Sequence, residues 1–176
     1  MSGTAKSKIF GVLDNIKKTF PALKEVLEAS WKEGGLDETM DLTFEAPSKV
    51  ATLPTFDKSK SHKLTPILKA RFEYASTIKY GQDIWLDPNQ MALSMADDEL
   101  NIYHTSLRDH WENSAPMRFK DKDLTLFGIT DGCPEYRVYL VWKNEGKEPE
   151  LWSYMGMEVL EFKNLEKFLK WHAGMK

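Results

Sequence analysis

The sequence has very little cysteine and no long hydrophobic run, and these two absences narrow the class of protein. The chain of 176 residues contains one cysteine, Cys133, so it cannot form an internal disulfide. Its uncharged stretches are far shorter than the ~20 apolar residues that a membrane-spanning helix needs. The first residues contain no apolar segment of signal-peptide length. These features together favour the reducing cytoplasm, where we expect the protein to act.

Residues at the spacing of a known catalytic or metal-binding motif are also missing. His104 and His110 are six positions apart, about 600° around a helix, so they point in different directions and form no metal pair. Cys133 stands in a predicted turn with no identifiable base beside it. There is no glycine-rich phosphate loop and no Gly-x-Ser-x-Gly elbow. We therefore predict a non-enzymatic protein that needs no metal and no cofactor.

The net charge is small, but the charges are unevenly distributed. A net charge of -3 does not favour a nucleic-acid partner. Lys49 to Lys79 contains seven Lys or Arg and two acids, whereas Tyr80 to Leu107 contains five acids and no Lys or Arg. Folding often places such basic and acidic stretches side by side, so that the protein surface has no face of a single charge. The alternative is a single acidic face that attracts a basic partner.

The acidic stretch and its aromatic neighbours are the candidate binding surface. Aromatic side chains often anchor protein interfaces, and acids of one sign steer association. The candidate residues are Asp83, Trp85, Asp87, Asp97, Asp98, Glu99, Tyr103 and Trp111. The alternative is that Asp97, Asp98 and Glu99 only begin a helix, where negative charge is favoured, while the aromatic rings are core.

The first half of the chain is predicted to be mainly helical. Apolar periodicity predicts amphipathic helices at about Ser7–Thr19 and Pro21–Trp31. Residues 36 to 62 are irregular, with a short strand at Met40–Phe44. Thr65 and Pro66 then begin a helix that Gly81 closes.

The second half changes to strands. A short strand at Ile84–Leu86, a turn at Asp87–Asn89 and a helix from Asp97 to about Trp111 come first. The later strands are predicted at Leu124–Ile129, Tyr136–Trp142, Leu151–Tyr154 and Val159–Phe162, followed by a helix that Asn164 caps. Successive strands with short turns predict an α+β fold, an antiparallel meander with helices packed on one face.

This pattern resembles the SUKH superfamily, the fold shared by yeast cell-wall-synthesis regulators and many bacterial immunity proteins. The residues that carry the resemblance are Leu124–Gly128, Tyr136–Trp142 with Glu148–Tyr154, and Val159–Phe168. A weaker likeness lies at Leu64–Pro66 and Lys79–Leu86, where the family's Asn-Gly pair lacks its Asn. The resemblance covers about residues 64 to 173, and it leaves residues 1 to 60 as a separable N-terminal extension.

The resemblance implies a non-enzymatic domain that binds other proteins. In bacteria such domains often neutralise secreted toxins, nucleases among them, and the family offers no catalytic or binding residue to transfer. Our first hypothesis is an immunity-type protein that occludes a basic toxin, with no nucleic-acid or membrane partner. The alternatives are a phage or mobile-element assembly protein, or a small-molecule-binding protein.

The missing metal motifs lead to the first testable prediction. Thermal unfolding curves with and without EDTA should superimpose, because no structural metal contributes to the free energy of folding. A fall of several degrees in melting temperature on chelation would contradict it.

Overall fold

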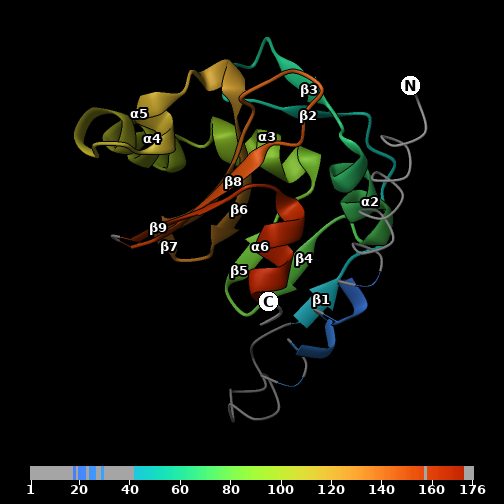
Figure 1. Ribbon diagram of the computed structural model, residues 1–176. Helices are drawn as coiled ribbons and strands as arrows, with labels where there is room; N and C mark the ends of the chain where they lie inside the picture. Colours follow the sequence, from blue (N-terminus) through green and yellow to red (C-terminus); the bar gives the residue numbers. More distant parts are fainter. Residues whose placement is uncertain are drawn as a thin grey trace.

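The computed structural model describes residues 18, 20–22, 24–26, 29, 42–156 and 158–172 (Figure 1). The described residues between 18 and 29 are helical, and most of the helix predicted from Ser7 lies outside the described residues. The strands are β1 Leu42–Phe44, β2 Thr52–Pro54, β3 Ser61–Lys63, β4 Ile78–Tyr80, β5 Asp83–Trp85, β6 Leu124–Thr130, β7 Cys133–Val141, β8 Glu150–Met155 and β9 Glu158–Phe162. The helices are α2 Pro66–Tyr74, α3 Pro88–Ala96, α4 Asp98–His110, α5 Ala115–Arg118, the 3-10 turn η1 Asp121–Asp123, and α6 Leu165–His172.

Seven strands form one antiparallel sheet in the order β1-β4-β5-β6-β7-β8-β9. From β4 onward every strand pairs with its neighbour in the chain, so the predicted α+β meander is confirmed. One of these connections is long. The segment between β5 and β6 carries α3, α4 and α5 before the chain returns to pair beside β5.

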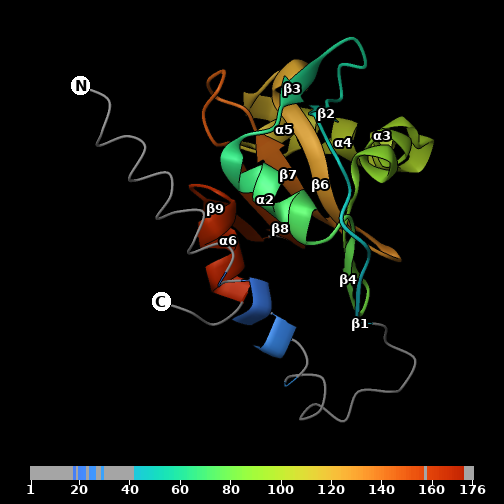
Figure 2. The same cartoon turned by 90° about the vertical axis from the view of Figure 1, so that its right-hand side faces the viewer.

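Helices cover both faces of the sheet, whereas the sequence led us to expect them on one. Adjacent residues of a strand point to opposite faces, and β7 shows both sides. Arg137 and Tyr139 contact α4, while Val138 lines a space shared with His172 of α6. Figure 2 shows the sheet between α6 on one side and α3 with α4 on the other.

The core on the α6 side is built from aromatic rings that lie close to the sheet. The Trp85 ring centroid lies 5.2 Å from that of Phe168, and Phe162 and Phe127 contact the same Phe168 ring. Gly128 makes this approach possible. A Cβ atom at this position would lie 3.3 Å from Trp85 Cδ1, so a larger residue would force the indole away from the sheet.

Helix α2 ends earlier than its sequence pattern predicts. The helix was expected to continue to Gly81, but it stops at Tyr74, and Ile78–Tyr80 forms β4. The buried side chain of Arg71 provides the reason. Its guanidinium donates to the carbonyl oxygens of Ala75 and Ser76, which then leave the helix and lead into the strand.

The segment predicted to be irregular contains a two-stranded hairpin that packs on the main sheet. Thr125 Oγ1 donates to Pro54 O at 2.6 Å, and Phe56 N donates to Leu124 O at 3.1 Å. The Leu53 side chain is fully buried. Packing is therefore continuous from the hairpin to β6 of the main sheet.

The hairpin's burial gives a stability prediction. Leu53→Ala should lower the free energy of unfolding by about 2–5 kcal/mol, the usual cost of a cavity left by a buried leucine. Leu93→Ala, the same substitution at a position that is 72% exposed, should cost less than about 0.5 kcal/mol. Urea denaturation measures both. Equal small losses would mean that the hairpin is a dispensable layer.

Candidate functional site

The connection between β5 and β6 begins with helix α3, which was not predicted from the sequence. Asp87–Asn89 was predicted to be a turn, but Asp87 is the N-cap of α3. Its carboxylate accepts hydrogen bonds from Asn89 N at 2.7 Å and Gln90 N at 3.0 Å, while Gln90 Oε1 accepts from Asp87 N at 2.9 Å. This reciprocal capping box, with Pro88 at the first helical position, fixes the start of α3. The carboxylate of Asp87 is therefore engaged within the fold.

Asp97 joins α3 to α4 and caps the second helix. Its carboxylate accepts a hydrogen bond from Leu100 N at 3.0 Å. Asp98 and Glu99 follow in the first turn of α4, where negative charge stabilises a helix, and both are exposed. The helix-start interpretation thus holds for Asp97. It leaves the carboxylates of Asp98 and Glu99 in solvent, where a second role is open to them.

An exposed and mostly uncharged stripe runs along α3 and continues onto α4. Helix α3 contains no charged residue, and its exposed positions recur with the period of one helix face. Leu93 and Ile102 are the most exposed large apolar side chains of the described residues, at 72% and 71%. Asn89 and His110, near the outer ends of the two helices, are exposed as well. We call the other exposed residues of the two helices the α3–α4 face: Ala92, Leu93, Ala96, Asp98, Glu99, Ile102, Thr105, Ser106 and Asp109.

A shallow pocket of ≈340 Å³ lies beside the first turn of α4. Asp97, Glu99 and Leu100 form one wall, and Asp131 and Pro134 of the β6–β7 hairpin contribute another. Three carboxylates from two separate segments therefore border one concavity. They extend the acidic rim of the α3–α4 face onto the edge of the sheet.

The structure separates the predicted aromatic anchors from this face. Trp85 is only 6% exposed and belongs to the core on the α6 side, where Asp83 also lies on β5. Trp111 is half-buried against the ring of Tyr154, at 5.7 Å between centroids. Tyr103 is half-buried on α4. Of the eight candidate residues, only the group from Asp97 to Glu99, with Tyr103 farther along α4, borders the α3–α4 face.

Buried Arg137 holds α4 on the sheet beneath this face. Arg137 Nη1 donates to Leu100 O at 2.9 Å and Nε donates to Pro134 O, while the guanidinium lies 4.4 Å from the centre of the Tyr103 ring. Burial raises the pKa of Tyr103, so its hydroxyl stays protonated at neutral pH. The first two turns of α4 are therefore fixed to β7 from below, leaving their outer side free.

A second anchor of α4 is a chain of polar side chains around His104. His104 Nε2 lies 3.2 Å from Asp121 Oδ1, and Nδ1 lies 3.3 Å from the hydroxyl of Tyr139. Arg108 also donates to Asp121, at 2.5 Å, and the Phe56 ring stacks on the imidazole at 3.8 Å. The neutral tautomer with its proton on Nε2 satisfies both contacts, because it donates to the carboxylate and accepts from the phenol.

The His104 chain has the order of a catalytic carboxylate–imidazole–hydroxyl group but not its accessibility. Tyr139 is completely buried and His104 is 5% exposed, so no substrate can reach the hydroxyl. Burial lowers the pKa of His104 to about 4, and the ion pair with Arg108 lowers the pKa of Asp121. These shifts fit a structural contact between α4, η1 and β7.

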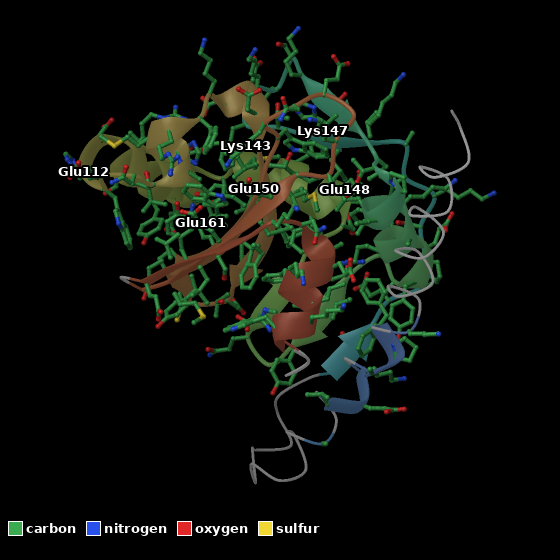
Figure 3. The ribbon with its side chains drawn as sticks, in the orientation of Figure 1. Glu112, Lys143, Lys147, Glu148, Glu150 and Glu161 are labelled. Carbon is green, nitrogen blue, oxygen red and sulfur yellow. The ribbon has the colours of Figure 1, made fainter. Side chains whose placement is uncertain are left out.

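A second group of charged residues surrounds the connection between β7 and β8 (Figure 3). Lys143 Nζ lies 2.7 Å from Glu150 Oε2, and Glu150 also accepts a hydrogen bond from Trp152 Nε1 at 3.2 Å. Glu148 accepts from Thr65 Oγ1 and from Ile67 N, so it caps α2 from a distant part of the chain. These charges are paired within the fold, and Trp152 is fully buried. The region is therefore a weaker candidate for binding.

Comparison with known proteins yields no relative. No family model matches the sequence, and neither a curated protein nor a solved structure matches the chain. Within residues 42–156 and 158–172 and the few described positions before them, no three His, Cys, Asp or Glu side chains are grouped as metal ligands. In the same described part of the chain, no helix has the length and apolarity to span a membrane.

The sequence pattern does not distinguish the exposed apolar residues of the α3–α4 face from buried ones. Leu93 and Met91 look alike in the sequence, yet Met91 is buried and Leu93 is exposed. One sequence signal could have indicated the face. The run Pro88–Ala96 contains no charged residue, and the residues Asp87–Gln90 at its start form a capping pattern. Together these features indicate a helix whose exposed face carries no charge.

The lowered pKa of His104 predicts how stability depends on pH. The folded state holds the pKa near 4 while the unfolded value is near 6.5, so the unfolded chain binds more protons between these values. The free energy of unfolding should therefore fall by about 3 kcal/mol from this residue as the pH drops from 6.5 to 4. His172, whose pKa burial also lowers to about 4, should add to the loss.

Urea denaturation of the wild type and His104→Gln at several pH values tests this contribution. Glutamine can still accept from Tyr139 and donate to Asp121, but it does not titrate, so its profile should be flatter. His110→Gln, an exposed position on the same helix, is the matched control. Parallel profiles for His104→Gln and the wild type would show that His104 does not carry the effect.

Proposed function

We propose that this protein is a protein-binding module that holds a basic partner on the α3–α4 face. The observation that carries the proposal is a pair of exposed large apolar side chains on two consecutive helices whose exposed charged residues, Asp98, Glu99 and Asp109, are all acids. Leu93 and Ile102 are each more than two-thirds exposed. Contiguous apolar surface with a polar rim is the usual mark of an interaction site.

The charges of the two helices support a basic partner. Arg108 is the only Lys or Arg in α3 and α4, and its guanidinium is paired with Asp121. Asp98, Glu99 and Asp109 remain exposed around the stripe, and Asp131 extends the acidic side. An uncompensated field of one sign accelerates association with an oppositely charged protein, and the effect weakens with salt.

The rigidity of the platform supports binding rather than induced folding. Arg137 and His104 join α4 to β7 from beneath, and Asp97 and Asp87 cap both helices. A surface that is already ordered loses little conformational entropy when a partner docks. The α3–α4 face is thus suited to recognition by shape and charge together.

The resemblance to the SUKH superfamily supports the same class of function. It implies a non-enzymatic, immunity-type protein of the cytoplasm that occludes a toxin, and the substrate groove of a nuclease is basic. The proposed partner is therefore a basic toxin or nuclease. The alternative assembly role depends on the N-terminal helices, and no contact described above favours it.

A comparison of captured proteins tests the proposal. The wild type and the variant Leu93→Ser/Ile102→Ser are used as baits in lysate, with Met117→Ser on α5 as the control at another exposed apolar residue. We expect one basic protein to be retained by the wild type and the control, and to bind the double variant at least tenfold more weakly, about 1.4 kcal/mol. Equal retention by the double variant would place the interface elsewhere.

The purified partner then allows the charge to be tested separately. Asp98→Asn/Glu99→Gln/Asp109→Asn should slow association several-fold at low salt and change little at high salt, because screening removes long-range attraction. Glu145→Gln/Glu158→Gln removes two exposed acids outside the face and is the control. An association rate that is independent of salt, with the triple variant unchanged, would refute the acidic face as the docking surface.

A further inference from the structure

We propose that a pocket on the other face of the sheet binds a small aromatic ligand with a cationic N–H edge. The pocket has a volume of ≈350 Å³, and Asp83, Trp85, Tyr136, Ser153 and His172 are among the residues that line it. This volume lies at the lower end of small-molecule sites, which span about 300–1,000 Å³. The site is independent of the α3–α4 face and of the function proposed for it.

The pocket exists because α6 covers only part of the sheet. Helix α6 crosses in front of β5 and β6, while β7, β8 and β9 extend beyond it (Figure 1). The space is bounded by His172 at the helix end, Trp85 on β5 and the backbone of Gly128 on β6. With no side chain at Gly128, the indole of Trp85 lies against the sheet and presents its remaining exposed edge to the pocket.

Two polar side chains facing this space lack a hydrogen-bond partner. Ser153 is 6% exposed and pairs across the sheet with Val138 and Leu160, so it points to the α6 side. Its hydroxyl makes no hydrogen bond to any described group. The His172 ring is held by Trp85 and Phe168, at 5.1 and 4.5 Å between centroids. Neither of its nitrogens is hydrogen-bonded to a described residue.

These unsatisfied groups point to a polar ligand. Ser153 Oγ and the His172 nitrogens are not among the fully enclosed side-chain atoms that lack a partner, so they open onto the pocket, where a ligand can reach them. The serine hydroxyl both donates and accepts, and a neutral imidazole offers one donor and one acceptor. Burial lowers the pKa of His172 to about 4, so its ring is uncharged at neutral pH. A planar molecule with N–H groups on its edge can satisfy both residues.

The sign of the ligand's charge follows from Asp83. Its Oδ1 accepts a hydrogen bond from Thr130 Oγ1 at 2.5 Å, which leaves the second oxygen for a ligand. Arg137 also lines the pocket, but its guanidinium donates to Leu100 O and Pro134 O on the α4 side. Among the described residues that line the pocket, Asp83 is the charged side chain on the α6 face of the sheet, and Arg137 lies on the opposite face with Nη2 unpaired. The carboxylate of Asp83 therefore favours a cation over an anion.

Titration with 2-aminobenzimidazole, a planar cation with two N–H groups on one edge, tests the site. Amide chemical shifts recorded by NMR should move for Gly128, Ser153 and Asp83, with a dissociation constant in the millimolar range or below, as expected for a fragment-sized ligand. Indole, which is neutral, should bind more weakly, and indole-2-carboxylate should not bind. Shifts confined to other surfaces, or equal binding of the anion, would overturn the proposal.

Two variants identify the contacts. Asp83→Asn keeps the acceptor for Thr130 but removes the charge, and Ser153→Ala removes the hydroxyl with little change in volume. Each should weaken the binding of 2-aminobenzimidazole at least fivefold, whereas Ser106→Ala on the α3–α4 face should have no effect. Wild-type affinity in both variants would show that neither side chain contacts the ligand and would overturn the proposal. Loss of partner capture, in contrast, would concern the α3–α4 face alone.

Discussion

The fold depends on a buried arginine that forms no ion pair with a carboxylate of the described residues. Arg71 is completely buried, and its guanidinium donates to the carbonyl oxygens of Ala75, Ser76 and Trp85. Placing a cation away from water is costly unless it is hydrogen-bonded, so these carbonyls must keep their positions. Arg71 Nε alone among the nitrogens of this guanidinium has no partner in the described residues. They belong to the end of α2, the approach to β4 and the end of β5. One side chain thus sets where the helix stops and how the sheet begins.

Burial lowers the pKa of Arg71 to about 9, with the charge of Asp87 acting in the opposite direction, so the group stays protonated at neutral pH. The rings of Phe72 and Phe127 lie 5.0 and 5.9 Å from the guanidinium carbon and add cation–π attraction. Arg137 is a second buried arginine, on the α4 side, and it also donates to main-chain carbonyl oxygens. The two faces of the sheet are therefore each fixed by a buried cation that bonds to backbone.

The strands of the second half were predictable because their pattern is local. Alternating apolar residues and the turns Asp131–Gly132 and Asn144–Gly146 locate β6 to β9 within one or two residues, apart from an earlier start to β7. The predicted helix α2 was too long. Its end depends on hydrogen bonds from the side chain of Arg71, and the apolar periodicity of the sequence carries no information about them. The strands β2 and β3 were missed because each has three residues and their pairing is stabilised by distant contacts to β6.

The candidate site was predictable only in its charge. A block of acids is visible in the sequence, and the structure leaves Asp98 and Glu99 exposed at the start of α4. The apolar half of the surface was not visible, because Leu93 differs from Met91 only in which side of α3 packs on the sheet. Trp85 was proposed as an anchor since large rings often occur at interfaces, but its position over Gly128 depends on strand register.

The long connection between β5 and β6 has a consequence for how such a protein can diversify. Trp85 and Gly128 are paired neighbours in the sheet, and the intervening chain returns to the same place. The buried residues of this connection, such as Met91, Met95 and Leu107, alternate with exposed residues along the same helices. Codon changes at the outward positions can therefore alter the surface of the two helices while the inward positions keep the scaffold. Under the proposed function, the residues that recognise a partner lie in one contiguous stretch of the gene, which recombination can exchange as a unit.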